Sequence, residues 1–209
     1  MSDILLILFA ITLIYIGVAN RLFTYISVLA FQGVLLFGIA FIQLIEINTI
    51  NLVFVLLETI IFKTIAIPIF LRRVIKRNQI KREAEPYVSN FVSVVIITAI
   101  IIGSFLLSNT VHDEHLEKMF FVIALSSLFT GLYIIASRRK VITHVMGFLI
   151  IENGVFVLSL AVGNEMPMLV NTGILLDIFV SVLLLGIFVN KIGDVIKEQD
   201  VESLSSLKD

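Results

Sequence analysis

The sequence predicts an all-α polytopic membrane protein with about seven transmembrane helices. Of its 209 residues, 59% are hydrophobic, well above the roughly 45–50% found in soluble domains. The mean hydropathy is +1.09. The apolar residues lie in runs long enough to cross a bilayer core of about 30 Å. Runs of this length are typical of helices, because a helix satisfies its own backbone hydrogen bonds in lipid.

Seven apolar segments are long enough to cross the membrane, with the first and fifth on the short side. They are residues 3–19, 22–45, 49–71, 87–107, 119–136, 141–162 and 169–190. The charged linker Arg72–Glu85 follows the third segment, and we expect it to continue that helix toward the interface.

The basic residues predict the orientation. All but two of the 15 lysines and arginines lie at the same end of this arrangement. The exceptions are Lys118, at the opposite end, and Lys63, inside the third segment. The positive-inside rule therefore places the N-terminus outside and the C-terminus in the cytoplasm. An even number of spans would scatter these charges over both faces.

The chain also shows a weak internal repeat of three helices. Gln32-Gly33 corresponds to Asn153-Gly154, and the two glycines are 121 residues apart. Glu58 corresponds to Asp177, which lies 119 residues later. Four helices separate equivalent spans, so the units run parallel about an axis along the membrane normal. We predict a first unit at 1–86, a linking helix and outer loop at 87–118, a second unit at 119–191 and a cytoplasmic tail at 192–209.

One carboxylate stands in the middle of the sixth segment. Glu152 lies near the centre of an apolar run that rises about 33 Å at 1.5 Å per residue, so it is expected near the bilayer midplane. An ionised carboxylate there costs several kcal/mol unless it is protonated, paired or hydrated. Such acids usually carry protons or ions, and the alternative is a neutral side chain that only joins helices.

Three further ionisable residues are embedded: Glu58, Lys63 and Asp177. In an α-helix, Glu58 and Lys63 would point about 140° apart, so each needs a partner on another helix, or water. Pro68 leaves the carbonyl of Thr64 without its usual donor and favours a local break. A buried lysine can change its protonation state. We interpret Glu152, Asp177, Lys63 and Glu58 as a proton relay, because four such residues fit simple helix packing poorly.

Other functional classes receive little support. The chain has no cysteine, so it supplies no thiolate to an iron–sulfur cluster or zinc. The loop His112–Glu117 contains histidines and acids, yet a short loop of this composition is a weak metal motif. No metal or cofactor site is expected in this chain.

Three segments resemble component E of hydrogenase-4 and formate-hydrogenlyase-type membrane complexes: Ser137–Gly154 (SRRKVITHVMGFLIIENG), Phe62–Pro68 (FKTIAIP) and Asp200–Lys208 (DVESLSSLK). The resemblance covers nearly the whole chain. It implies a non-catalytic subunit of a complex-I-like nickel–iron hydrogenase assembly in a bacterial or archaeal cytoplasmic membrane. The chain would then lie between an antiporter-like subunit and the membrane anchor of the redox arm, and the redox chemistry would belong to these partners.

The second half, from about residue 119, is also similar to subunit K of respiratory complex I. That family carries two intramembrane glutamates implicated in proton transfer. Asp177 matches the second of them, whereas Glu152 lies three residues after the first, where this chain has Leu149. Three residues are nearly one helical turn, a shift of about 4.5 Å in depth on the same face.

The sequence thus predicts a subunit that contributes to a mid-membrane proton or Na⁺ pathway. Glu152 and Asp177 would be the relay sites, Lys63 a switchable cation beside them and Glu58 a weaker member. Gly154 and Asn153 would serve helix packing, and Pro68 a break in its helix. Two alternatives remain at this point: an autonomous small antiporter, and a purely structural scaffold.

Overall fold

The computed structural model describes residues 2–44, 56–77, 86–111 and 116–162. These residues all belong to one unit of the chain, residues 1–174. Within them every regular element is a helix, and an isolated β-bridge pairs Pro86 with Arg138. The elements are α1 (Ser2–Val18), α2 (Leu22–Leu44), the π-helix η1 (Glu58–Ala66), α4 (Ile67–Arg77), α5 (Asn90–Thr110), α6 (Lys118–Ser137) and α7 (Val141–Val162).

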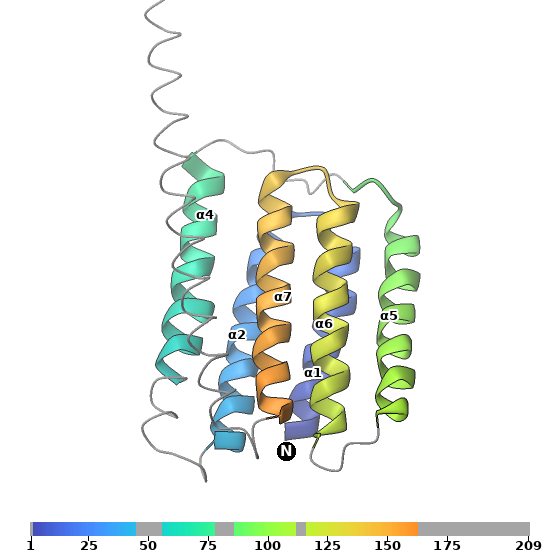
Figure 1. Ribbon diagram of the computed structural model, residues 1–209. Coiled ribbons are helices and arrows are strands. Elements are labelled where there is room, and N and C mark those ends of the chain that lie inside the picture. Colours follow the sequence, from blue (N-terminus) through green and yellow to red (C-terminus); the bar gives the residue numbers. More distant parts are fainter. Residues whose placement is uncertain (1, 45–55, 78–85, 112–115, 163–209) are drawn as a thin grey trace, which may run out of the picture. The chain divides into compact units, whose positions relative to one another are not determined.

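Four helices form the centre of the described part. α1 contacts α2, α2 contacts α7, α7 contacts α6, and α6 contacts α1. On one edge α5 packs against α1 and α6, and on the other η1 and α4 pack against α2 (Figure 1). α7 is the most buried of the long apolar helices. Glu152 therefore lies on the helix that is best shielded from the surroundings.

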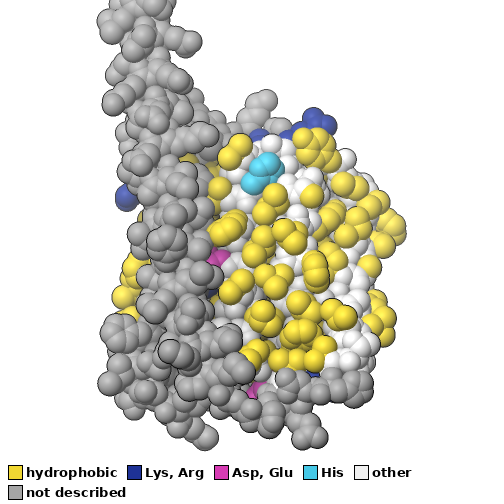
Figure 2. Space-filling model, viewed as in Figure 1, with side chains coloured by type: hydrophobic (Ala, Val, Ile, Leu, Met, Phe, Trp, Pro, Cys, Tyr) yellow, Lys and Arg dark blue, Asp and Glu magenta, His cyan; other side chains and the backbone are white. Residues whose placement is uncertain are grey.

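The outer helix α5 has the side-chain distribution of a membrane helix. It buries the small polar residues Ser93, Ser104 and Ser108 together with Ile97. Its large apolar side chains point outward, and Phe105 and Leu106 are both exposed. Small residues at helix interfaces and apolar residues outside are typical of helices in lipid. Figure 2 shows the same character on the visible face, where hydrophobic side chains are widely spread.

The apolar helices confirm the all-helical, membrane-type fold over the described residues. Four of them are long and apolar enough to cross a bilayer: 22–43, 90–110, 118–137 and 141–162. These correspond to the second, fourth, fifth and sixth predicted segments. The 17 residues of α1 form a shorter apolar helix at the first segment. The seventh segment, 169–190, lies outside the described residues, so the total of seven spans stays a prediction.

α6 and α7 pack with their backbones unusually close. A Cβ atom added at Gly131 would lie 2.6 Å from the carbonyl oxygen of Gly147, and one at Gly147 would lie 2.9 Å from that of Gly131. A Cβ at Gly154 would lie 3.0 Å from the carbonyl oxygen of Ala124. The hydroxyl of Ser127 also donates to the carbonyl of Ile150 at 2.7 Å. This small-residue interface fixes the helix that carries Glu152.

The helix that carries Lys63 departs from α geometry immediately before Pro68. Residues 58–66 are π-helical, and the N–H of Ile67 donates to the carbonyl of Phe62, five residues back. Proline lacks the N–H that an α-helix would use at its position. The α-helical angle of 140° expected between Glu58 and Lys63 is therefore wrong, because a π-helix pairs residues i and i+5. The side chain of Glu58 lies outside the described atoms.

Beyond the π-helix, α4 continues to Arg77. The expected helical extension of the third span is thus confirmed as far as that residue. Arg72 reaches across to α2, where its Nη2 donates to the hydroxyl of Ser27 at 3.4 Å. The basic end of α4 consequently lies beside the start of α2.

Candidate functional site

A chain of hydrogen bonds connects four helices through the interior. The Nζ of Lys63 donates to Oδ1 of Asn153 at 3.1 Å, and Nδ2 of Asn153 donates to Oε1 of Gln32 at 3.0 Å. The Nε2 of Gln32 then donates to the hydroxyl of Thr12 at 2.8 Å, and that hydroxyl donates to the carbonyl of Phe9 at 2.6 Å. The chain passes from η1 through α7 and α2 to α1.

Every bond in this chain points the same way. Each group donates toward α1, so the carbonyl oxygen of Asn153 is the atom turned toward Lys63. An acceptor in that position pairs with one N–H of the Lys63 amino group. The Lys63 Nζ also lies 5.0 Å from the ring centroid of Phe156, a distance at which the ring face attracts a cation. Both contacts hold the Lys63 amino group inside the bundle.

Glu152 and Lys63 line the same small cavity. Lys63 is 5% exposed and Glu152 is 6% exposed. They surround a space of about 10 Å³ together with Asn153, Leu29, Ile67 and Leu149. A single buried water needs roughly 10–15 Å³ of such space. The cavity thus brings a carboxyl and an amine, both able to change protonation state, to a space the size of one water molecule.

The polar residues at this site belong to two chemical kinds. Lys63 and Glu152 carry ionisable groups, whereas the amides of Asn153 and Gln32 neither gain nor lose protons in water. The amides therefore orient and stabilise Lys63 without conducting protons toward α1. Lys63 and Glu152 border the same space, which is large enough for one water molecule. The arrangement therefore places two ionisable groups beside one small cavity.

A second buried cation lies at the basic end of the bundle. Arg138 is 1% exposed, and its Nε and Nη2 donate to the hydroxyl of Tyr25 at 2.9 Å and to the carbonyl of Gly17 at 3.1 Å. Its own carbonyl lies 2.8 Å from Nε2 of His144. Among the described residues its Nη1 has no hydrogen-bond acceptor. Arg138 thus ties α1 and α2 to the turn between α6 and α7.

The structure brings together three of the residues that the sequence singled out. Lys63, Glu152 and Asn153 meet at the cavity, and Pro68 follows the π-helix that carries Lys63. Glu58 begins that π-helix, but its side chain lies outside the described atoms. Asp177, the second proposed relay site, lies outside the described residues. The metal motif at His112–Glu117 is described only at residues 116 and 117, and no cluster of metal-binding side chains occurs in the described ranges.

Three contributors were missed by sequence reasoning. Gln32 and Thr12 were not considered site residues, although a glutamine in an apolar helix is a signal of a buried hydrogen-bond partner. Arg138 was counted only among the basic residues that predict the orientation, whereas it is buried and donates to Tyr25 and Gly17 on other helices. Gln32 and Asn153, which are equivalent in the proposed repeat, bond to each other.

Comparison with known proteins leaves the function open. No protein-family model matches the sequence, and no solved structure matches it. The chain is similar to the uncharacterized protein Rv0085 of Mycobacterium tuberculosis (strain ATCC 25618 / H37Rv), with 23% identity over 189 residues. The similarity covers 88% of this chain and 85% of that protein. Two chains of similar length thus share sequence along most of their lengths.

Proposed function

We propose that this chain is a non-catalytic membrane subunit of a complex-I-like, nickel–iron hydrogenase-type assembly. In that assembly it contributes part of a proton or Na⁺ pathway across the middle of the membrane. Redox chemistry takes place in partner subunits, and the chain lies between an antiporter-like subunit and the membrane anchor of the redox arm. The N-terminus is outside and the C-terminus is in the cytoplasm, as the positive-inside rule indicates.

One observation carries the proposal: Lys63 and Glu152 share a buried cavity of about 10 Å³. Intramembrane ionisable residues are rare and mark ion pathways more often than simple packing. Here an acid and a base meet between η1 and α7, next to a π-helical turn. π-Helical turns occur frequently at functional sites. Glu152 and Lys63 are therefore the proposed relay pair. Asp177 and Glu58 extend the proposed pathway, because both are ionisable residues within apolar segments of the sequence.

The neutral amides limit the course of the proposed proton pathway. Because Asn153 and Gln32 do not titrate, protons do not continue from Lys63 toward α1. The pathway instead runs between Lys63 on η1 and Glu152 on α7, and onward to groups on other helices or other subunits. Asn153 acts as a positioning residue that keeps Lys63 beside Glu152.

Purification with partners tests the assignment to a complex. The tagged chain is extracted in mild detergent, and the proteins that accompany it are identified by mass spectrometry. We expect a nickel–iron hydrogenase and antiporter-like subunits in stoichiometric amounts. A stable chain that purifies alone would overturn the subunit proposal and would favour an autonomous antiporter.

A further inference from the structure

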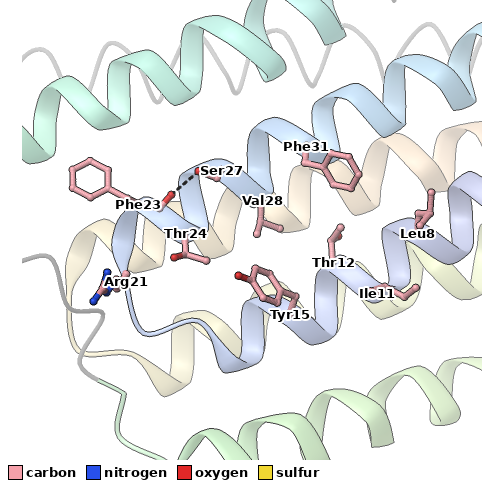
Figure 3. A pocket seen from close by; sticks show the side chains of 10 residues that line it. All are labelled: Leu8, Ile11, Thr12, Tyr15, Arg21, Phe23, Thr24, Ser27, Val28 and Phe31. Carbon is pink, nitrogen blue, oxygen red and sulfur yellow. Dashed lines mark hydrogen bonds between the residues drawn. The ribbon is translucent and has the colours of Figure 1, made fainter.

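A groove of about 870 Å³ runs along α1 and α2. Figure 3 shows side chains from both helices lining it. It is lined by Leu8, Ile11, Thr12, Tyr15, Arg21, Phe23, Thr24, Ser27, Val28 and Phe31. Thr12 and Val28 are buried, whereas Ile11 and Phe31 are exposed. The groove therefore has a floor of small buried residues and walls of larger apolar side chains.

The lining changes from polar to apolar along the helices. Arg21 lies at the turn between α1 and α2, and Thr24 and Ser27 are in the first two turns of α2. Tyr15 faces them from the last turn of α1 (Figure 3). Leu8 lies seven residues further down α1, about 10 Å deeper at 1.5 Å per residue. One end can thus accept a polar group at the membrane interface, and the remainder can accept a hydrocarbon chain.

The polar end is positively charged. Arg21 is exposed, and none of the described lining residues is acidic. Arg72 of α4 adds a second guanidinium at this end, where its Nη2 donates to the hydroxyl of Ser27. Arg72 is itself part of a basic surface with Arg73 and Lys76. Each Lys or Arg near the membrane surface favours an anionic lipid by about fivefold.

We propose that this groove binds one anionic glycerophospholipid of the leaflet at the basic end. Its phosphate would bind Arg21, with Arg72 beside it, and the hydroxyls of Thr24 and Tyr15 would donate to its oxygens. One acyl chain would lie against Val28 between Ile11 and Phe31. The basic end complements a negatively charged headgroup, and the apolar remainder of the groove suits an acyl chain. A protein helix fits less well, because its polar backbone atoms are already hydrogen-bonded to one another. The inference rests on a membrane location and not on the proton relay.

Native mass spectrometry with added lipid tests this site. The full-length protein is delipidated in detergent and titrated with phosphatidylglycerol or phosphatidylcholine of the same acyl chains. We expect the first phosphatidylglycerol to bind at least fivefold more tightly than phosphatidylcholine. Arg21→Gln should reduce that preference about fivefold. Lys118→Gln, which removes an exposed charge at the other end of the bundle, should leave the preference unchanged.

A second variant tests the apolar part of the groove. Ile11→Trp changes an exposed wall residue and should weaken binding of both lipids while keeping the preference for phosphatidylglycerol. Equal binding of the two lipids by the unmodified protein would overturn the proposal. So would an Arg21→Gln protein that behaves like Lys118→Gln. A protein found to cover Arg21 in the purified assembly would also overturn it, in favour of a protein interface.

Discussion

One acceptor of Lys63 is itself fixed by two further bonds. Asn153 gives its carbonyl oxygen to Lys63 because its amide nitrogen is committed to Gln32. Gln32 is fully buried and is held in turn by Thr12. These hydrogen bonds favour one orientation of the Asn153 and Gln32 amides. Residues on α1 and α2 therefore help to position Lys63, together with its own helix.

Asn153→Leu should destabilise the protein. The substitution removes one acceptor from a buried amine and removes the Asn153 donor from the Gln32 carbonyl. We expect a loss of about 1–3 kcal/mol, more than the roughly 0.6 kcal/mol typical of hydrogen bonds between membrane helices. Ser159→Ala is the control, because within the described residues Ser159 donates to the carbonyl of Phe156 on its own helix. Thermal unfolding in detergent measures the stability of both variants. Equal unfolding midpoints for Asn153→Leu and Ser159→Ala would contradict the account.

Arg138→Lys should also destabilise the protein, although it conserves the charge. A lysine cannot reproduce the fork that binds Tyr25 and Gly17 together. Loss of one hydrogen bond to a buried charged group costs about 1.5–3 kcal/mol. The neighbouring Arg139→Lys is the matched control, since Arg139 is exposed and stacks on the Tyr87 ring at 4.8 Å. Unfolding midpoints that fall equally in the two variants would argue against a buried Arg138.

At the scale of the helix, the contact between α6 and α7 determines where Glu152 lies. Gly131, Gly147 and Gly154 allow the two backbones to approach along most of their length. Residues of this kind drive helix association in lipid, where apolar burial alone offers little gain. A side chain at any of these positions would push α7 away from α6.

Gly131→Ala tests this contact. Its new Cβ would lie 2.6 Å from the carbonyl oxygen of Gly147, a backbone atom that cannot move aside. We expect a loss of about 1–3 kcal/mol from overpacking. Gly103→Ala on α5 is the control, because no atom of the described residues lies within 4 Å of its Cβ position. Alanine there should stabilise the helix slightly, so a Gly131→Ala protein as stable as Gly103→Ala would contradict the close packing.

The helices themselves were predictable, and much of the site was not. The bounds of α7 follow from a long, mostly apolar run with charges before it, and the predicted and observed ranges agree. The meeting of Lys63 with Asn153 could not be predicted, because it depends on how separate helices pack. The π-helix was missed for a different reason. Pro68 predicts a break in the α-helix, but the form of that break depends on which backbone carbonyls still accept hydrogen bonds.

At the scale of the whole molecule, the described basic residues gather at one end. Figure 2 shows lysine and arginine side chains mainly at that end of the visible face. The opposite end carries Lys118 and Glu117, whose Oε1 accepts from Nε2 of Gln43 at 2.7 Å. The apolar helices between the two ends supply a surface suited to lipid. This distribution is what the positive-inside rule uses to assign the cytoplasmic face.

Cysteine labelling tests the orientation. The chain has no cysteine, so single cysteines at exposed positions report without background. Lys118→Cys should react with a membrane-impermeant maleimide in intact cells, whereas Arg139→Cys should react only after lysis. The reversed pattern would place the N-terminus inside, and labelling of both sites in intact cells would contradict a membrane-spanning arrangement between them.

The most direct test of the relay is Glu152→Gln in the purified assembly. The change keeps the size and hydrogen-bonding capacity of the side chain and removes its titration. Proton uptake is measured in proteoliposomes while redox turnover is followed in the same sample. The relay account predicts that coupled proton movement falls at least tenfold, while Glu152→Asp, which keeps a carboxyl group, retains part of it. Unchanged proton movement in a correctly assembled Glu152→Gln complex would contradict the account and leave a structural role for Glu152.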